Sequence, residues 1–280
     1  MSVLTSRRVL AAVRALFLTA TALFVLLPLA VVVVNSFRGA TAAGGGAGLT
    51  LRWYREALSY EPFTTGLLYS TQVAVLATLI SVVVGTMAAY AVARLDFPGR
   101  EPLRSLFVAP LSLPRVVAGF CLFVLYASLF PAAYGTVGGI AFAHCLLLLP
   151  FVVAVVGAAL AGLDPALEEA ARDLGASPLA AFARITLPQI RPALLAATVF
   201  AFLTSFDEVD TSVFLMPADT TTLPVAMFLR LEQRQDPTVT AMSSLLIAGS
   251  LLLAALAAVA ARRVAAALVH TPAPQGAHSP

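Results

Sequence analysis

The sequence predicts an all-α membrane protein with six transmembrane helices. The chain of 280 residues is 60% hydrophobic and only 11% charged, whereas a soluble domain carries about 25% charged residues. No soluble core could hide this much apolar surface, so lipid is the expected solvent for most of the chain. Stretches without charge, close to the roughly 20 residues that a helix needs to cross a bilayer, then locate the helices.

Uncharged stretches place the expected spans in order along the chain. The stretch 116–163 carries no charge and is too long for one helix, and Pro131 and the glycines that follow interrupt it. It supplies the end of the third span, whose start Arg104 and Arg115 bracket, and the whole of the fourth. The fifth span is short. The third span is expected to begin between Arg104 and Arg115 and to run to about Leu129, and the other five are expected at roughly residues 15–37, 67–93, 136–160, 192–206 and 239–261.

Six spans place both ends of the chain on one side of the membrane. The 17 basic residues are all arginines, and eleven of them fall on that side, which the positive-inside rule assigns to the cytoplasm. The net charge of +3 then follows from topology and gives no indication of nucleic-acid binding. We expect a cytoplasmic N-terminus at 1–14, a transmembrane domain at 15–264 with a cytoplasmic loop at 161–191, and a flexible C-terminal tail at 265–280. The cytoplasmic arginines are Arg7, Arg8, Arg14, Arg94, Arg100, Arg104, Arg172, Arg184, Arg191, Arg262 and Arg263.

The segment before the first span admits a second interpretation. Ser6-Arg7-Arg8 followed by an apolar stretch faintly resembles a twin-arginine export signal. The stretch is too long for such a signal and lacks a clear small-x-small cleavage site, so an uncleaved first helix is favoured. After this helix, the Gly- and Ala-rich residues 40–48 predict a flexible loop, and Trp53 and Tyr54 suit the boundary between water and lipid.

The polar segment between the fourth and fifth spans predicts two short helices joined by a turn. Asp164-Pro165 and Ser177-Pro178 each pair an N-cap residue with a proline at the first helical position. Gly175 permits the left-handed turn that ends the first helix. A thin apolar stripe at helical spacing follows the first helix, formed by Leu167, Ala170, Ala171 and Leu174.

This helix–turn–helix can either dock a partner protein or lie on the lipid surface. Its alanines let another backbone approach closely. The apolar stripe lacks aromatic residues and is flanked by acids, which makes it a poor match for anionic lipid. Docking is therefore the favoured interpretation. Glu168 and Arg172, four residues apart, are expected to form an ion pair worth a few tenths of a kcal/mol.

The complete pattern resembles the cytoplasmic motif of permeases from bacterial ABC importers, the MetI-like family of binding-protein-dependent transport. The matching residues are Glu169, Ala170, Ala171, Gly175, Ile185, Leu187 and Pro188. The resemblance implies the MetI-like permease fold with cytoplasmic coupling helices. It also implies that these residues, together with Glu168, couple the chain to a separate ATPase subunit by seating this loop in a groove of that subunit.

The chain itself has no G-x-x-x-x-G-K-[ST] phosphate loop and no lysine with which to build one. The resemblance therefore implies a transport subunit that is not an enzyme, with ATP and Mg bound by the partner ATPase. It further implies two ATPase copies, a second homologous permease, and a periplasmic or lipid-anchored substrate-binding protein. The expected location is the bacterial inner membrane, with lipid as a further partner and no nucleic acid.

Segments outside the loop resemble one branch of the family, the spermidine/putrescine permeases. The matching segments are Pro28 to Phe37, Leu49 to Tyr54, Ser205 to Val209, Thr222-Leu223-Pro224 and Asp236-Pro237-Thr238. The resemblance implies passage of a small cationic solute. Related branches that import ferric iron, thiamine or aminophosphonates share much of this pattern, so these solutes stay open as alternatives.

An acidic cluster follows the fifth span. Asp207, Glu208 and Asp210 could form the cation-attracting mouth of a pathway, or they could begin a solvated loop. The resemblance implies that Trp53, Ser205, Asp207 and Glu208 contribute to polyamine passage. An aromatic face combined with carboxylates suits an alkylammonium ion, through cation–π contact and ion pairing.

Arg115 departs from the branch, which carries an aspartate after the proline of the third span, where this chain reads Leu113-Pro114-Arg115. An arginine that faced the pathway would repel a polycation and attract an anion. The alternative is an arginine that snorkels to the interface or pairs with Asp207, Glu208 or Asp210. Both interpretations stay open, and Arg115 joins the candidate path residues.

Other reactive side chains offer no site. His144 in the fourth span could relay protons, but a hydrogen-bonded helix histidine is the favoured interpretation. Cys121 and Cys145 lie in apolar spans without CxxC spacing and are expected to be packing residues. Two rival functions are a stand-alone secondary transporter and a membrane enzyme. The first lacks intramembrane acids in most spans and visible repeats, and the second lacks a catalytic constellation.

Overall fold

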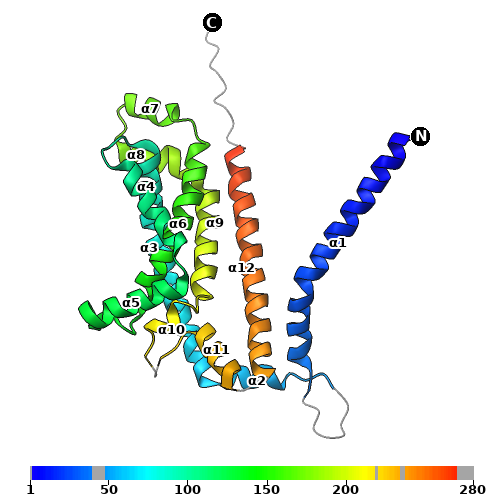
Figure 1. The fold of residues 1–280 in the computed structure, drawn as a ribbon. Helices are drawn as coiled ribbons and strands as arrows, with labels where there is room; N and C mark the ends of the chain where they lie inside the picture. Colours follow the sequence, from blue (N-terminus) through cyan, green and yellow to red (C-terminus); the bar gives the residue numbers. More distant parts are fainter. Residues whose placement is uncertain (1, 40–47, 218–219, 234–236, 270–280) are drawn as a thin grey trace. The chain divides into compact units, whose positions relative to one another are not determined.

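A computed structural model describes residues 2–39, 48–217, 220–233 and 237–269. The chain divides into two compact units. Unit 1 comprises Met1–Phe63 and Met227–Gly249, and unit 2 comprises Thr64–Ala226 and Ser250–Pro280. The elements of the described residues are helical, which confirms the predicted all-α class (Figure 1).

The described residues form fifteen helical elements in chain order. They are α1 (Ser2–Phe37), α2 (Arg52–Ser59), α3 (Glu61–Arg94), α4 (Arg100–Val108), η1 (Ala109–Ser112), α5 (Arg115–Leu129), η2 (Pro131–Ala133), α6 (Val137–Ala161), α7 (Ala166–Asp173), α8 (Pro178–Ala181), η3 (Phe182–Thr186), α9 (Leu187–Phe206), α10 (Ser212–Leu215), α11 (Leu223–Gln233) and α12 (Pro237–Val269).

Unit 1 is joined by hydrogen bonds from α2. The Tyr54 hydroxyl lies 2.6 Å from the Ser36 hydroxyl of α1 and 2.8 Å from the Ser244 hydroxyl of α12. Trp53 donates from its indole nitrogen to the Arg38 carbonyl at 2.8 Å. The two aromatic residues predicted at the membrane boundary therefore hold the end of α1 and the start of α12 against α2.

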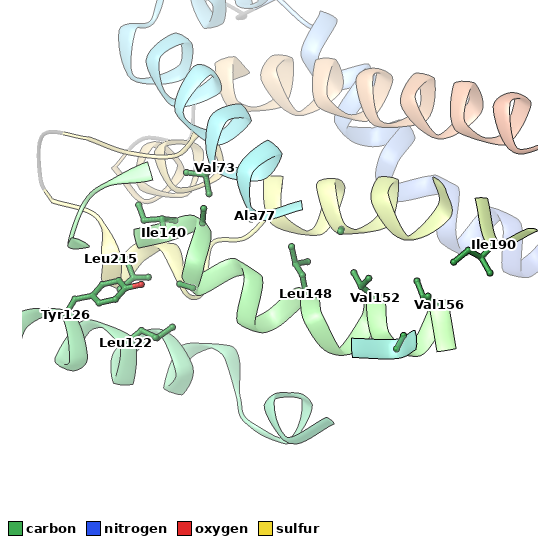
Figure 2. Packing of buried hydrophobic residues seen from close by; sticks show 14 of the residues in the cluster. Val73, Ala77, Leu122, Tyr126, Ile140, Leu148, Val152, Val156, Ile190 and Leu215 are labelled. Carbon is green, nitrogen blue, oxygen red and sulfur yellow. The ribbon is translucent and has the colours of Figure 1, made fainter. Parts of the chain in front are cut away.

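Unit 2 is built around α6. Its residues Ile140, Leu148 and Val152 are almost completely buried. Residues of α3, α5, α9 and α10 surround this row (Figure 2), among them Val73, Ala77, Leu122, Tyr126, Ile190 and Leu215. Gly85 of α3 brings the backbone close to α6, because a Cβ atom there would lie 2.7 Å from Val152 Cγ1. Small residues that allow such close approach are typical of helix packing in membranes.

The predicted count of six full-length spans is not reproduced. Among the described residues, the helices long and apolar enough to cross a membrane are Val9–Phe37, Glu61–Arg94, Val137–Ala161, Pro178–Phe206 and Pro237–Arg263. The expected third span is instead divided into α4, η1 and the shorter α5. Pro110 and Pro114 explain the division, because proline donates no backbone hydrogen bond and disfavours helix at the residue before it.

The fifth span was predicted too short. The helical stretch begins at Pro178, passes through the π-helical turn η3 and continues as α9 to Phe206. Pro188 lies at the start of α9, where a missing amide proton is tolerated. The Gln189 side chain donates to the Ile185 carbonyl at 2.8 Å, so a side chain replaces part of the backbone bonding in this region.

Other boundaries agree more closely. Thr136 caps α6 as its side chain accepts a hydrogen bond from the Gly139 amide at 3.0 Å, at the predicted start of the fourth span. In contrast, α12 continues to Val269, into the segment predicted as a tail, because its alanines favour helix. Residues 40–47 of the predicted loop and the tail from residue 270 lie outside the described residues.

Candidate functional site

The loop between α6 and α9 has the predicted turn geometry. The Asp164 carboxylate accepts a hydrogen bond from the Ala166 amide at 3.0 Å, where α7 begins. Gly175 has φ +90°, and the Ala176 amide donates to the Ala171 carbonyl at 3.0 Å to close the helix. Ser177 accepts from the Ala180 amide at 3.3 Å and starts α8. These bonds fix the elbow between α7 and α8.

The elbow lies at one end of α6 and α9 (Figure 1) and presents apolar side chains that this chain leaves uncovered. Leu174 is 90% exposed, Leu179 76% and Leu167 49%. Glu169, Ala170 and Gly175 are also exposed. The remaining motif residues are half-buried, and these are Ala171, Ile185, Leu187 and Pro188. The motif thus has an outward half on α7 and an inward half that leads into α9.

Glu168 points to a different side of α7 from this surface. It is only 8% exposed, and its carboxylate accepts hydrogen bonds from the Tyr90 hydroxyl at 2.8 Å and from the Thr186 hydroxyl. The Arg94 guanidinium nitrogen Nε lies 3.7 Å from the same carboxylate. The predicted ion pair with Arg172 is wrong, because these buried groups have drawn the carboxylate inward.

The second candidate site lies where α5 meets the segment after α9. Arg115 donates from Nη1 to Glu208 Oε2 at 2.8 Å, and the Thr211 amide donates to Glu208 Oε1 at 3.1 Å. Glu208 is 3% exposed, whereas the Arg115 side chain is 44% exposed. In the structure Arg115 pairs with an acid, as the second of its two interpretations predicted.

Asp207 and Asp210 do not share this burial and are exposed residues. Surrounding segments nevertheless withdraw the Asp207 carboxyl from solvent, and this raises its pKa above the ordinary value, while the nearby positive charge of Arg115 acts in the opposite direction. The predicted acidic cluster is therefore divided into one buried carboxylate, Glu208, and two acids on exposed residues, Asp207 and Asp210.

A buried hydrogen-bond chain adjoins this cluster. His144 of α6 lies 2.8 Å from the Ser205 hydroxyl through Nδ1 and 2.9 Å from the Ser212 hydroxyl through Nε2. The favoured interpretation of His144 is confirmed, since both ring nitrogens have partners. Ser205, a candidate path residue, is itself buried and engaged in this chain. Trp53, the remaining candidate path residue in this group, belongs to unit 1, where it is largely buried and donates to the Arg38 carbonyl.

Several residues of these sites were not identified from the sequence, namely Tyr90, Arg94, Thr186, Thr211 and Ser212. The only available signal was the spacing of Tyr90 and Arg94, which lie one helical turn apart at the end of the second span. No group of three or more His, Cys, Asp or Glu side chains that could hold a metal ion occurs among the residues that the structure describes.

Comparison with known proteins finds relatives that are membrane components of transport systems. Residues 81–266 match the family described as binding-protein-dependent transport system inner membrane component. The putrescine transport system permease protein PotI of Escherichia coli (strain K12) is 32% identical over 230 residues, which cover 80% of this chain and 82% of PotI. The spermidine/putrescine permease protein PotC of the same strain is 28% identical, covering 85% of this chain and 89% of PotC.

A further relative and two solved structures extend the comparison. The sulfate transport system permease protein CysT of Salmonella typhimurium is 34% identical over 193 residues, covering 64% of this chain and 70% of CysT. A bacterial ABC transporter that imports alginate aligns with a TM-score of 0.70 at 17% identity, covering 90% of this chain and 96% of that chain. The inward-facing MetNI methionine transporter aligns with a TM-score of 0.63 at 16% identity, covering 73% and 96%.

Proposed function

Since the chain belongs to the family of binding-protein-dependent transport system inner membrane components, we propose that it conducts a small cationic amine of the putrescine and spermidine class. The chain is a multi-pass permease of an ABC importer and is not an enzyme, because ATP hydrolysis in this family belongs to partner ATPase subunits. Such permeases work with ATPase subunits and substrate-binding proteins.

The observation that carries the solute class is the likeness to PotI along 80% of this chain at 32% identity. The charge arrangement after α9 supports the same class. The positive charge of Arg115 is balanced by the negative charge of the buried Glu208. Arg115 therefore no longer argues against passage of a cation. Asp207 and Asp210 remain exposed and can attract an alkylammonium group.

The elbow of α7 and α8 is the proposed coupling surface. Exposed leucines beside Glu169 and Ala170 offer an apolar patch that a groove in an ATPase can bury. We assign the elbow to the cytoplasm, with both termini on that side, which requires α4, η1 and α5 together to make the sixth crossing. The proposed assembly contains two ATPase copies, a second permease and one binding protein. ATP-driven closure of the ATPases then rocks the helices between inward and outward openings.

A second solute class has one specific observation in its favour. The sulfate permease CysT is slightly more identical to this chain, although over a shorter segment. An anion would be expected to approach Arg115, whose side chain is nearly half exposed. A transport assay must therefore include sulfate beside the amines.

The test is transport by the complete complex. The permeases, ATPase and binding protein are co-expressed, purified together and reconstituted into vesicles, and uptake of labelled putrescine, spermidine and sulfate is measured with and without ATP. We expect ATP-dependent uptake of an amine. Replacing Glu169 by Ala should reduce ATPase retention, while Glu101→Gln, an exposed acid on α4, should retain it. Uptake by this chain alone, without ATPase, would contradict the proposal.

A further inference from the structure

We propose that Glu168 transmits the displacement of α7 into the membrane helices, as a buried anchor distinct from the surface that meets the ATPase. This inference rests on the proposed function and deepens it. Consecutive helical residues point about 100° apart, and here two neighbouring acids point to different surroundings. Glu169 is exposed, whereas Glu168 is buried among groups of the permease itself.

The first link joins α7 to α3. Tyr90 donates its hydroxyl to Glu168 Oε2 at 2.8 Å, and Arg94, one turn further along α3, places Nε 3.7 Å from Oε1. Both partners come from the last turns of a helix that is long enough to span the membrane. A shift of α7 therefore acts directly on the end of α3.

The second link joins α7 to the start of the fifth span. Thr186, the last residue of the π-helical turn η3, donates its hydroxyl to Glu168 Oε1 and is itself only 1% exposed. The Phe182 ring of η3 packs edge-on against Tyr90, with ring centroids 4.9 Å apart. Because α9 continues from Thr186, the same carboxylate also holds the entry to α9.

The third link passes through Arg94 to α6. The Arg94 nitrogen Nη2 donates to the Leu160 carbonyl at 3.2 Å and to the Leu163 carbonyl at 3.1 Å. The last carbonyls of a helix have no partner within the helix, and Arg94 supplies one at the end of α6. One carboxylate thus ties the elbow to the ends of α3, α6 and η3.

Glu168 and its partners are expected to move together, because separating them would leave the buried carboxylate of Glu168 unpaired. A buried carboxylate that loses its donors bears a desolvation penalty far larger than the net gain from an ordinary hydrogen bond. If α7 is pulled outward, the low-energy response is for its donors to follow it. Glu168 is therefore a positioning residue for transport, and it acts through Tyr90, Arg94 and Thr186.

The experiment compares coupling with assembly in the complete reconstituted complex. Glu168→Ala removes the anchor. Glu168→Gln keeps an acceptor oxygen for one of the two donors Tyr90 and Thr186, which bond different carboxylate oxygens, and removes the charge that Arg94 meets. Glu101→Gln is the exposed control. Three quantities are measured: the ATPase retained, the ATP hydrolysed, and the solute moved per ATP. We expect retention and hydrolysis to persist in Glu168→Ala while solute per ATP falls about tenfold, or about 1.4 kcal/mol of coupling. Glu168→Gln should fall in between, and Glu101→Gln should match the unaltered complex.

The outcomes separate this inference from the proposed function. An unaltered complex that retains no ATPase or moves no solute would remove the proposed function itself. A working complex in which Glu168→Ala leaves solute per ATP unchanged would overturn only the anchor, even if yield or thermal stability dropped. Should Glu168→Ala fail to fold, Tyr90→Phe and Thr186→Val each remove one donor without exposing a charge. Each is expected to lower solute per ATP about threefold, and unchanged coupling in both would also overturn the inference.

Discussion

Arg115 and Glu208 are joined at 2.8 Å, so the first residue of α5 is bound to the segment between α9 and α10. The Thr211 hydroxyl also donates to the Arg115 carbonyl at 3.3 Å, which makes the contact reciprocal. Gly119 of α5 lies against the same segment, since a Cβ atom there would be 2.8 Å from Thr211 Cα. The short helix α5 is thus fixed to this segment by charge, hydrogen bonding and close backbone approach.

Removing Arg115 should destabilise the permease. Arg115→Ala leaves Glu208 buried without its cation, and we expect a loss of about 1–3 kcal/mol, reduced from the fully buried case because Arg115 is partly exposed. Thermal unfolding in detergent measures this loss. The double variant Arg115→Ala with Glu208→Gln should recover part of it, since no uncompensated charge remains. Strictly additive losses would show that the pair contributes nothing.

Gly175→Ala should weaken ATPase retention. The residue has φ +90° with open space around it, so the cost is backbone strain of about 1 kcal/mol or more. Gly99 is a matched control, because it has φ +92° and equally open surroundings outside the elbow. Both alanine variants should lose similar stability, but only Gly175→Ala should lose ATPase in co-purification. Gly175→Asn should keep more of it, because asparagine tolerates the left-handed conformation. Equal retention in both alanine variants would exclude a special role for this turn.

Adjacent glycines at the start of α6 should respond in opposite ways. A Cβ atom on Gly139 would collide with the Ala133 carbonyl, whereas one on Gly138 would meet nothing. Gly139→Ala is expected to cost about 1–3 kcal/mol, and Gly138→Ala to be neutral or stabilising by up to about 1 kcal/mol. Melting temperatures of the two variants give the comparison. Similar melting temperatures would mean that η2 does not pack on α6 as described.

Asp207 should make amine uptake sensitive to acid. Although the residue is exposed, partial withdrawal of its carboxyl group from solvent raises its pKa. The carboxylate is therefore protonated, and its attraction for a cation lost, at a higher pH than for an ordinary aspartate. Uptake should therefore decline as pH falls through this raised pKa, and Asp207→Asn should lower uptake and flatten that decline. Asp210→Asn should lower uptake with little effect on stability. Uptake is measured from pH 7 downward. If both variants showed the same pH dependence and rate of uptake as the unaltered transporter, this role would be excluded.

The features that were predictable from sequence are those decided within a few residues. Asp164, Gly175 and Ser177 act through bonds to residues no more than three positions away or through their own backbone angles, so the elbow between α7 and α8 could be predicted with its caps. The charge-free stretch that became α6 was placed to within one residue at each end. The coupling role of the motif could be predicted only from the resemblance to the family.

The features that were missed depend on distant partners. Glu168 is separated by 78 residues from Tyr90, so nothing near it in the sequence distinguished an inward acid from an outward one. The choice of Glu208 over Asp207 and Asp210 as the partner of Arg115 likewise follows from tertiary packing. The continuation of helix through Pro188 was missed because a π-helical turn has no simple sequence pattern.

The two cysteines differ in a way that offers a spectroscopic handle. Cys121 of α5 is exposed, whereas Cys145 of α6 is buried. A thiol-reactive spin label or fluorophore should therefore select the native Cys121, six residues beyond Arg115, without an introduced cysteine. Its signal would report in real time whether α5 moves as nucleotide is added to the assembled transporter.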